Sequence, residues 1–130
     1  MKLGFMGLCL ALVLSACAPT LERSTASYQA EAEAVILAIA QIAPQLKYAD
    51  IFQAYAVDEL SERAITISAD TTQAASAMGV VGRSEITFTL LESGGVSTVA
   101  TRVRGNAGAE MDNWTLSTIF SNLDRRFLRL

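Results

Sequence analysis

Two alternating runs joined by a pair of glycines constrain the fold more than any other feature of the sequence. Residues 84–91 and 96–103 each place apolar or β-branched side chains at every second position, which is the period of a strand with one buried face. The apolar positions are Ile86, Phe88 and Leu90 in the first run and Val99 and Val103 in the second. The intervening residues 92–95 end in Gly94 and Gly95, which readily take the positive φ angles of a tight turn. We therefore predict an antiparallel hairpin over residues 84–103.

A second hairpin is predicted upstream. Residues 51–57 carry aromatic and β-branched side chains, and residues 64–69 alternate with Ile65 and Ile67 on one face. Residues 58–63 form a polar break between the two runs. We expect these runs to be adjacent antiparallel strands.

Two amphipathic helices flank the predicted strands. Residues 28–43 place apolar side chains at three- and four-residue spacing, and Pro44 favours an end to this helix near residue 43. Residues 113–127 carry a second stripe, with Asp112 as the candidate N-cap. The stripes consist of Ala32, Val35, Ile36, Ile39, Ile42 and Ala43 in the first helix and of Leu116, Ile119, Phe120, Leu123 and Phe127 in the second. Each stripe predicts one buried face.

Residues 70–83 permit two interpretations. They are rich in Thr, Ala and Ser and include Met78, Val80 and Val81. The segment is either a mobile connection or a flexible apolar flap over a groove, because exposed Met and Val side chains form adaptable contact surfaces. Trp114 lies off its helical stripe, so it either packs against the loop that enters the helix or is an exposed contact residue. We take Met78, Val80, Val81 and Trp114 as candidate contact residues for a ligand or a partner.

The order of these elements is helix, four strands, helix. It predicts an α+β fold in which a four-stranded antiparallel sheet carries the N-terminal and the C-terminal helix on one face (α-β-β-β-β-α), since this buries both apolar stripes. In element order the chain resembles the helix-grip or BamC-like modules of bacterial envelope lipoproteins. That resemblance concerns the fold alone.

The N-terminus has the layout of a secretory signal peptide. Lys2 precedes an apolar run over residues 3–13 that is shorter than the roughly 20 residues needed to cross a bilayer. The run ends in Leu14-Ser15-Ala16-Cys17, which resembles the lipobox of bacterial lipoproteins. The resemblance implies a signal peptide over residues 1–16, cleavage before Cys17 and a lipid on the Cys17 thiol. Residues 17–27 are then a tether, and residues 28–130 a single domain.

The same resemblance implies a location. In the lipoprotein family an Asp directly after the lipidated Cys tends to retain the protein in the inner membrane, and this chain has Ala18 there. We therefore expect the outer membrane, with the domain facing the periplasm and the Cys17 lipid as the membrane contact.

Composition argues against several function classes. Loss of Lys2 with residues 1–16 leaves nine basic residues against thirteen acidic ones, so the mature chain lacks the basic face that nucleic acids require. The chain has no His, Cys9 lies in the predicted signal peptide and Cys17 carries the predicted lipid, so we expect no metal site, no cofactor and no Cys–His nucleophile. Asp58, Glu59 and Glu62 cluster in a predicted surface turn. Carboxylates there stay hydrated and are poorly suited to acid–base catalysis. We predict no catalytic residue and no enzymatic activity.

Two functions fit these constraints. The first is a membrane-anchored, non-enzymatic interaction or accessory module with a protein partner in the cell envelope. The second is a binding protein that holds a lipid or another apolar ligand between the sheet and the helices, which the apolar segment 78–82 and the off-stripe Leu37 and Trp114 favour. A closed core favours the first function, and an apolar pocket beneath residues 70–83 favours the second.

Overall fold

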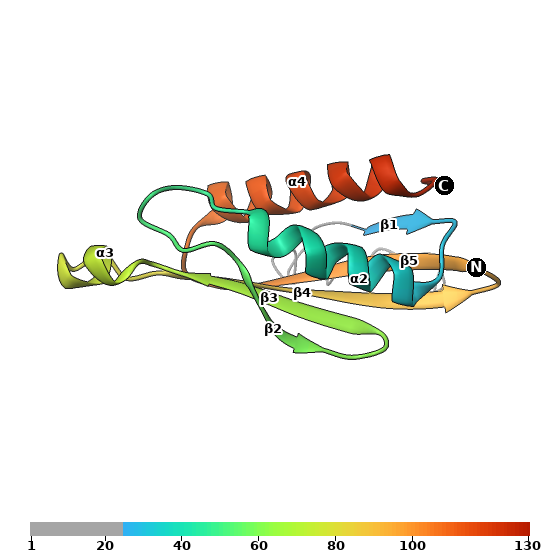
Figure 1. Cartoon of the computed structure of the whole chain (residues 1–130), viewed down its shortest axis with the longest axis horizontal. Helices are drawn as coiled ribbons and strands as arrows, with labels where there is room; N and C mark the ends of the chain where they lie inside the picture. The colour runs from blue at the N-terminus through green and yellow to red at the C-terminus, as the bar shows by residue number, and fades with distance from the viewer. Residues whose placement is uncertain (1–24) are drawn as a thin grey trace, which may run out of the picture.

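The computed structural model describes residues 25–130 and has an α+β architecture with a single antiparallel sheet (Figure 1). The sheet has five strands in the order β1-β5-β4-β3-β2. In chain order the elements are β1 (Thr25–Tyr28), α2 (Ala32–Ile42), the short 3₁₀-helix η1 (Ala43–Gln45), β2 (Ala56–Leu60), β3 (Ala64–Asp70), α3 (Gln73–Ala77), β4 (Arg83–Ser93), β5 (Val96–Gly105) and α4 (Ala109–Arg126). The predicted signal peptide, the lipobox with Cys17 and most of the tether lie outside the described residues.

The predicted count of four strands is wrong, because β1 adds a fifth. Thr25–Ser27 were placed in the tether and Tyr28 in the first helix, yet all four residues pair with β5. Ala26 and Tyr28 face the core and are almost fully buried. Two apolar positions are too few to reveal a strand period, so it is the pairing with Ser97–Ala100 that makes this segment a strand.

The predicted hairpin over residues 84–103 is confirmed. β4 and β5 pair from Ser84↔Gly105 to Ser93↔Val96, and the turn between them is made by Gly94 (φ 59°) and Gly95 (φ 78°). Positive φ at both positions matches the right-handed twist of a two-residue hairpin. The predicted apolar face of β4 is almost completely buried.

The first hairpin is shifted from its predicted position. β2 covers residues 56–60, whereas we expected a strand over residues 51–57 and a polar break over residues 58–63. All five β2 residues are exposed, and a bulge interrupts the pairing between Val57 and Glu59. Charged side chains and bulges are typical of an edge strand, which explains why Asp58 and Glu59 lie in a strand rather than in a turn.

Both long helices begin elsewhere than predicted. α2 starts at Ala32, whose backbone N–H donates to Glu92 Oε1 at 2.7 Å, and α4 starts at Ala109. Asp112 is not the N-cap of α4, because Gly108 (φ 112°) occupies that position and Asp112 lies within the first turns. Leu37 lies off the apolar stripe of α2 and is 50 % exposed, so no other element within residues 25–130 covers that side of the helix.

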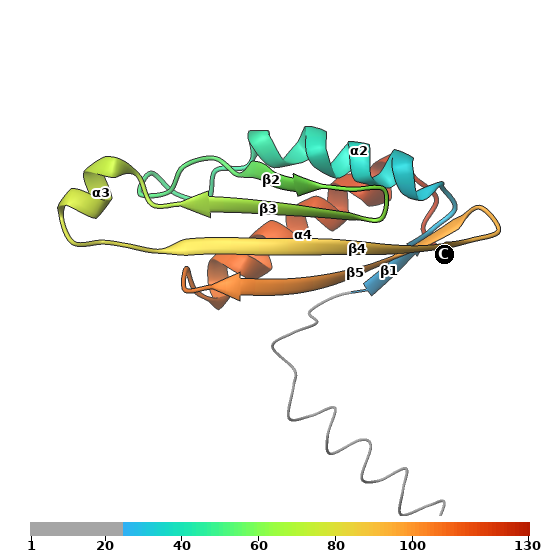
Figure 2. The same ribbon diagram turned by 90° about the horizontal axis from the view of Figure 1, so that it is seen from below.

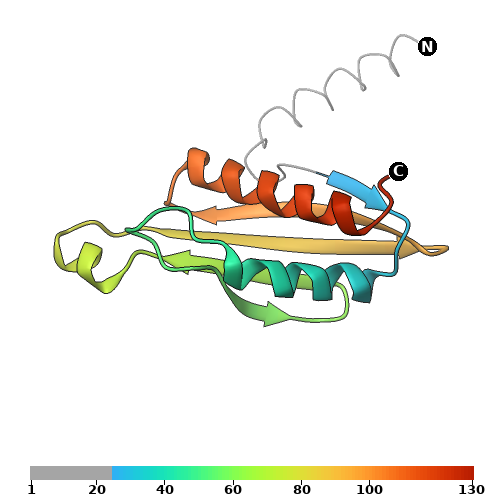
Figure 3. The ribbon, with the colours of Figure 1, turned by 45° about the horizontal axis from the view of Figure 1, so that its top comes forward.

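The core fills the space between α2 and α4 and one face of the sheet. Its fully buried members include Ile39, Ile119 and Leu123 on the helices and Ile65 and Phe88 on the strands. The view in Figure 3 shows both helices running along the strands on one side of the sheet, and Figure 2 shows the other face of the sheet with no helix over it. The short helix α3 projects beyond the end of the sheet that is opposite to the Gly94–Gly95 turn (Figure 1).

Candidate interaction surface

The segment between β3 and β4 is a projection with a well-defined base. It contains α3, whose N-cap Thr72 accepts a hydrogen bond from the Ala75 N–H at 3.2 Å. At the base, the Thr71 N–H donates to the Gly82 carbonyl at 3.1 Å and the Thr72 N–H donates to the Ile51 carbonyl at 2.8 Å. Neither sequence interpretation included a helix here, because five residues without an apolar stripe give no helical period.

The projection presents apolar side chains to solvent. The exposed fractions are 84 % for Met78, 44 % for Val80 and 73 % for Val81. Ile51, at the base of the projection, is 45 % exposed. We call Met78, Val80 and Val81 the apolar tip. All three are candidate contact residues from the sequence.

Trp114 is exposed, as one of its two sequence interpretations requires, but it also packs against another aromatic ring. It packs against Tyr48 in the loop after η1, with ring centroids 5.4 Å apart, rather than against the loop that enters α4. Tyr48 in turn packs against Phe52 at 6.5 Å, and a Cβ on Gly82 would lie 3.7 Å from the Phe52 ring. This row of aromatic rings connects Trp114 to the base of the projection. With 36 % of its surface exposed, Trp114 is part of the packing at this end of the molecule.

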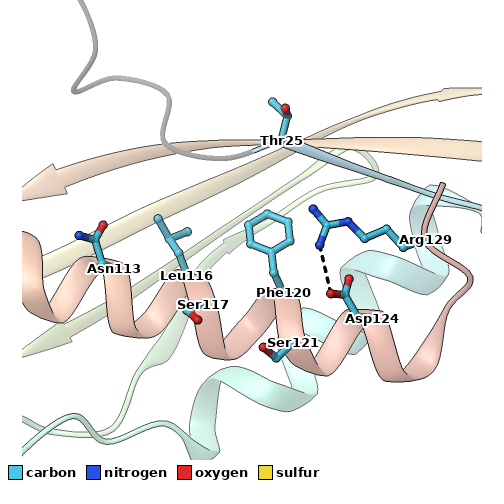
Figure 4. Close-up of a pocket in the computed structure, with 8 residues that line it drawn as sticks. All are labelled: Thr25, Asn113, Leu116, Ser117, Phe120, Ser121, Asp124 and Arg129. Atoms are coloured by element: carbon cyan, nitrogen blue, oxygen red, sulfur yellow. Dashed lines mark hydrogen bonds and ion pairs between the residues drawn. The ribbon is translucent and has the colours of Figure 1, made fainter.

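Several hollows in the described part of the chain lie away from the projection. One of about 490 Å³ lies beside α4, where Leu116 and Phe120 form its apolar wall (Figure 4). Its other side is formed by Thr25 and by Arg129, which pairs with Asp124 at 3.1 Å. This hollow is open and lined mainly by small polar side chains, so it is not the apolar pocket beneath residues 70–83 that a lipid-binding protein would need.

A buried chain of hydrogen bonds joins α4 to the sheet. The Thr115 hydroxyl donates to the Tyr55 hydroxyl oxygen (2.8 Å), Tyr55 donates to Ser84 Oγ (2.8 Å) and Ser84 donates to Asp112 Oδ1 (2.9 Å). All four residues are buried, and burial raises the pKa of the Tyr55 phenol. Because Ser84 is fully buried, no substrate reaches it, and the chain of hydrogen bonds is structural.

A cluster of ion pairs lies on the opposite, open face of the sheet. The Arg83 guanidinium contacts Asp58 (2.7 Å), Asp70 (2.9 Å) and Glu85 (3.4 Å). The hydrogen bond with Asp70 is the main reason why the pKa of Arg83 is raised further. The prediction of a turn at Asp58 is therefore wrong, because Asp58 lies in β2 and is an ion-pair partner of Arg83. The sequence did not reveal this cluster, because its members are brought together only by the strand register.

Two further properties of residues 25–130 bear on function. Acidic side chains do not gather anywhere among them in a group that could hold a metal ion. No helix in this part of the chain has the length and apolar character required to cross a membrane.

The comparisons with known proteins assign no family. No protein-family model matches the sequence, and the searches of curated proteins and of solved structures found no significant match. The resemblances to a lipobox and to BamC-like modules therefore stay predictions.

Proposed function

We propose that this protein is a lipoprotein of the bacterial cell envelope that acts as a non-enzymatic interaction or accessory module. In this proposal the Cys17 lipid anchors it in the outer membrane, and the domain faces the periplasm and binds an envelope protein. The lipobox pattern Leu14-Ser15-Ala16-Cys17 supports the anchor. The observation that carries the interaction role is the apolar tip.

The apolar tip supports an interaction role because the fold does not need it. Met78 and Val81 are more exposed than any residue that packs on the core, and both lie on a projection with a hydrogen-bonded base. Contiguous exposed apolar side chains on a small domain are typical of contact surfaces, and methionine adapts its shape to a partner. β1, through which the chain enters the domain, pairs with the half of β5 next to the Gly94–Gly95 turn, at the other end of the sheet from α3. The apolar tip and β1 therefore lie toward opposite ends of the sheet.

The lipid-binding alternative has less support. The side chains between the sheet and the helices fill that space, with Ile39, Phe88 and Ile119 fully buried. A ligand would have to displace them, which costs several kcal/mol in a close-packed core.

The interaction role is tested by purifying the lipidated protein from its native membranes in mild detergent. We expect a protein partner to co-purify with the wild type and to be lost from a variant that combines Met78→Ser with Val81→Ser. Leu91→Ser is the matched control, since Leu91 is 72 % exposed but lies on the open face of the sheet. A partner retained equally by all three proteins would contradict the role of the apolar tip. Stoichiometric co-purification of a lipid would favour the ligand-binding alternative.

The anchor is tested separately by labelling cells with palmitate and fractionating their membranes. We expect label in the wild type and none in Cys17→Ser, because the thiol is the predicted site of attachment. Acyl chains anchor a protein because each buried CH₂ contributes about 0.8 kcal/mol. The variant without acyl chains should therefore be absent from the outer-membrane fraction. Equal labelling of the two proteins would exclude the lipoprotein assignment, whereas labelled wild type in the inner membrane would exclude only the outer-membrane location.

A further inference from the structure

A second surface, distant from the apolar tip, lies between α2 and the turn that joins β2 to β3. Here Leu37 of α2 and Leu60 of β2 line a hollow of about 600 Å³. Half or more of each side chain is exposed, 50 % for Leu37 and 56 % for Leu60. Ile36, which is 3 % exposed, also lines the hollow and belongs to the core. We call this hollow the leucine groove.

The rim of the leucine groove is strongly acidic. Its charged residues are Glu31, Glu33, Glu62, Glu92 and Arg63. Glu92 Oε1 accepts from the Ala32 N–H (2.7 Å) and from Arg63 (3.3 Å), so these two charges balance each other within the fold. Within residues 25–130, no ion pair engages the carboxylates of Glu31, Glu33 or Glu62. Three negative charges therefore surround two exposed leucines.

We infer that the leucine groove binds a basic, apolar segment of a partner protein. An apolar side chain of the segment lies between Leu37 and Leu60, and flanking Lys or Arg side chains lie against Glu31, Glu33 and Glu62. Burial of the two leucines supplies the affinity, at about 25 cal/mol per Å² of apolar surface removed from water. The carboxylates select positive segments and speed their approach, because charge complementarity acts mainly on specificity and association rate. Binding at the leucine groove does not depend on the apolar tip, so an experiment that contradicts a role for one surface leaves the other untouched.

A second copy of this chain is the other occupant to consider. The C-terminus carries Arg125 and Arg126 together with Leu128 and Leu130, which are 63 % and 64 % exposed. Contact between this end of one copy and the leucine groove of another would join two different surfaces, and such contacts give open chains unless the rotation closes a ring. We therefore commit to a segment of a different protein and treat self-association as an outcome of the test.

The test uses the full-length protein, purified from membranes and reconstituted in phosphatidylcholine nanodiscs, with empty nanodiscs as the background. The probe is a fluorescein-labelled amphipathic helix of leucine and lysine, and its anisotropy reports binding. We expect saturable binding at low salt that weakens as salt rises. Glu33→Gln combined with Glu62→Gln should weaken binding about tenfold, since it removes two of the three rim charges that no ion pair within residues 25–130 engages. Leu37→Ser should weaken it to a similar degree.

Matched variants separate the groove from general charge. Asp50→Asn combined with Glu59→Gln removes the same charge outside the groove, and Leu91→Ser removes an even more exposed leucine (72 %) from the open face; neither should change binding by more than about twofold. The inference is overturned if the wild type does not bind the probe, if a leucine–glutamate helix binds equally well, or if the groove and control variants lose affinity equally. Self-association of the wild type in sedimentation velocity that Glu33→Gln with Glu62→Gln abolishes would overturn the assignment to a different protein and identify a second copy as the occupant.

Discussion

The β4–β5 hairpin and the connection between β3 and β4 use their apolar residues in opposite ways. In the hairpin, Ile86, Phe88 and Leu90 are at most 1 % exposed, and they alternate with polar residues on the open face. In residues 71–82, which connect β3 to β4, Met78 and Val81 are largely exposed. Core packing explains the first set and does not explain the second. Residues that stability does not require are therefore the best indication of function in this chain.

The largest effect on stability should come from Gly105→Ala at the base of the hairpin. Gly105 has φ 99°, and a Cβ there would collide with the Arg83 carbonyl oxygen. Positive φ and overpacking together should lower the free energy of unfolding by about 3 kcal/mol. Urea denaturation followed by circular dichroism measures this, with Gly79→Ala as the control, because Gly79 also has positive φ (87°) but has nothing within 4 Å of its would-be Cβ. Equal losses of unfolding free energy in the two variants would mean that the contact with the Arg83 carbonyl does not add to the cost of positive φ.

A smaller loss is expected at the turn of the hairpin. Gly94→Val and Gly95→Val each force a β-branched residue into positive φ, with open space around the new side chain. Each should cost about 2 kcal/mol, because only the backbone is strained. Thermal unfolding measures this, and a change in either variant of less than a few tenths of a kcal/mol would contradict the two-glycine turn.

Alkaline pH should weaken the attachment of the sheet to α4. Burial, aided by a hydrogen bond to Asp124, raises the pKa of Tyr28 above its usual 10.0, and burial raises the pKa of Tyr55 as well. A tyrosine whose pKa is higher in the folded state retains its proton there while the unfolded chain loses it. The contribution of these two tyrosines to the free energy of unfolding should thus be constant below about pH 10 and fall above it, by up to about 1.4 kcal/mol per pH unit for each tyrosine.

The slope of this pH dependence is the measurable quantity. Denaturation curves between pH 8 and pH 11 should show a shallower fall in Tyr55→Phe than in the wild type, whatever the stability of the variant at neutral pH. An unchanged slope would mean that Tyr55 titrates in the folded protein as it does in the unfolded chain.

The smallest effect on stability should come from the apolar tip. Met78→Ser combined with Val81→Ser should change the free energy of unfolding by less than about 0.5 kcal/mol, since both side chains are mostly exposed. Val99→Ser in the hairpin is the contrasting variant, because Val99 is fully buried and its replacement by a polar residue should cost about 2 kcal/mol or more. Comparable losses in the two proteins would show that the tip belongs to the core.

The regular parts of the fold were predictable from the sequence because their signals are local. The alternation in residues 84–103 and the Gly94–Gly95 pair specify one hairpin, and the two apolar stripes specify two helices on one face. β1 was missed because Ala26 and Tyr28 gain their strand conformation only from pairing with β5. β2 was displaced because an exposed edge strand has no buried face to produce a period.

The polar contacts were less predictable for the same reason. Asp112 and Thr115 lie three residues apart on the buried face of α4. Their hydrogen-bond partners, Ser84 and Tyr55, come from distant segments of the chain, so no local pattern reveals them. Among the candidate contact residues, the sequence identified the exposed side chains Met78, Val80 and Val81 but not the packing of Trp114 on Tyr48. The sequence can therefore name candidate residues, whereas their exposure and their pairing follow from the fold.

The central claim, that the apolar tip contacts an envelope protein, is tested most directly by cross-linking in living cells. A photoreactive benzoyl-phenylalanine placed at Val81 or at Leu91 samples two side chains of nearly equal exposure, 73 % and 72 %, on the projection and on the open face of the sheet. The account predicts a discrete cross-linked species from Val81, absent from Leu91 and lost when Cys17→Ser removes the anchor. The same cross-linked species from both positions, or none from Val81 in correctly localised protein, would contradict it.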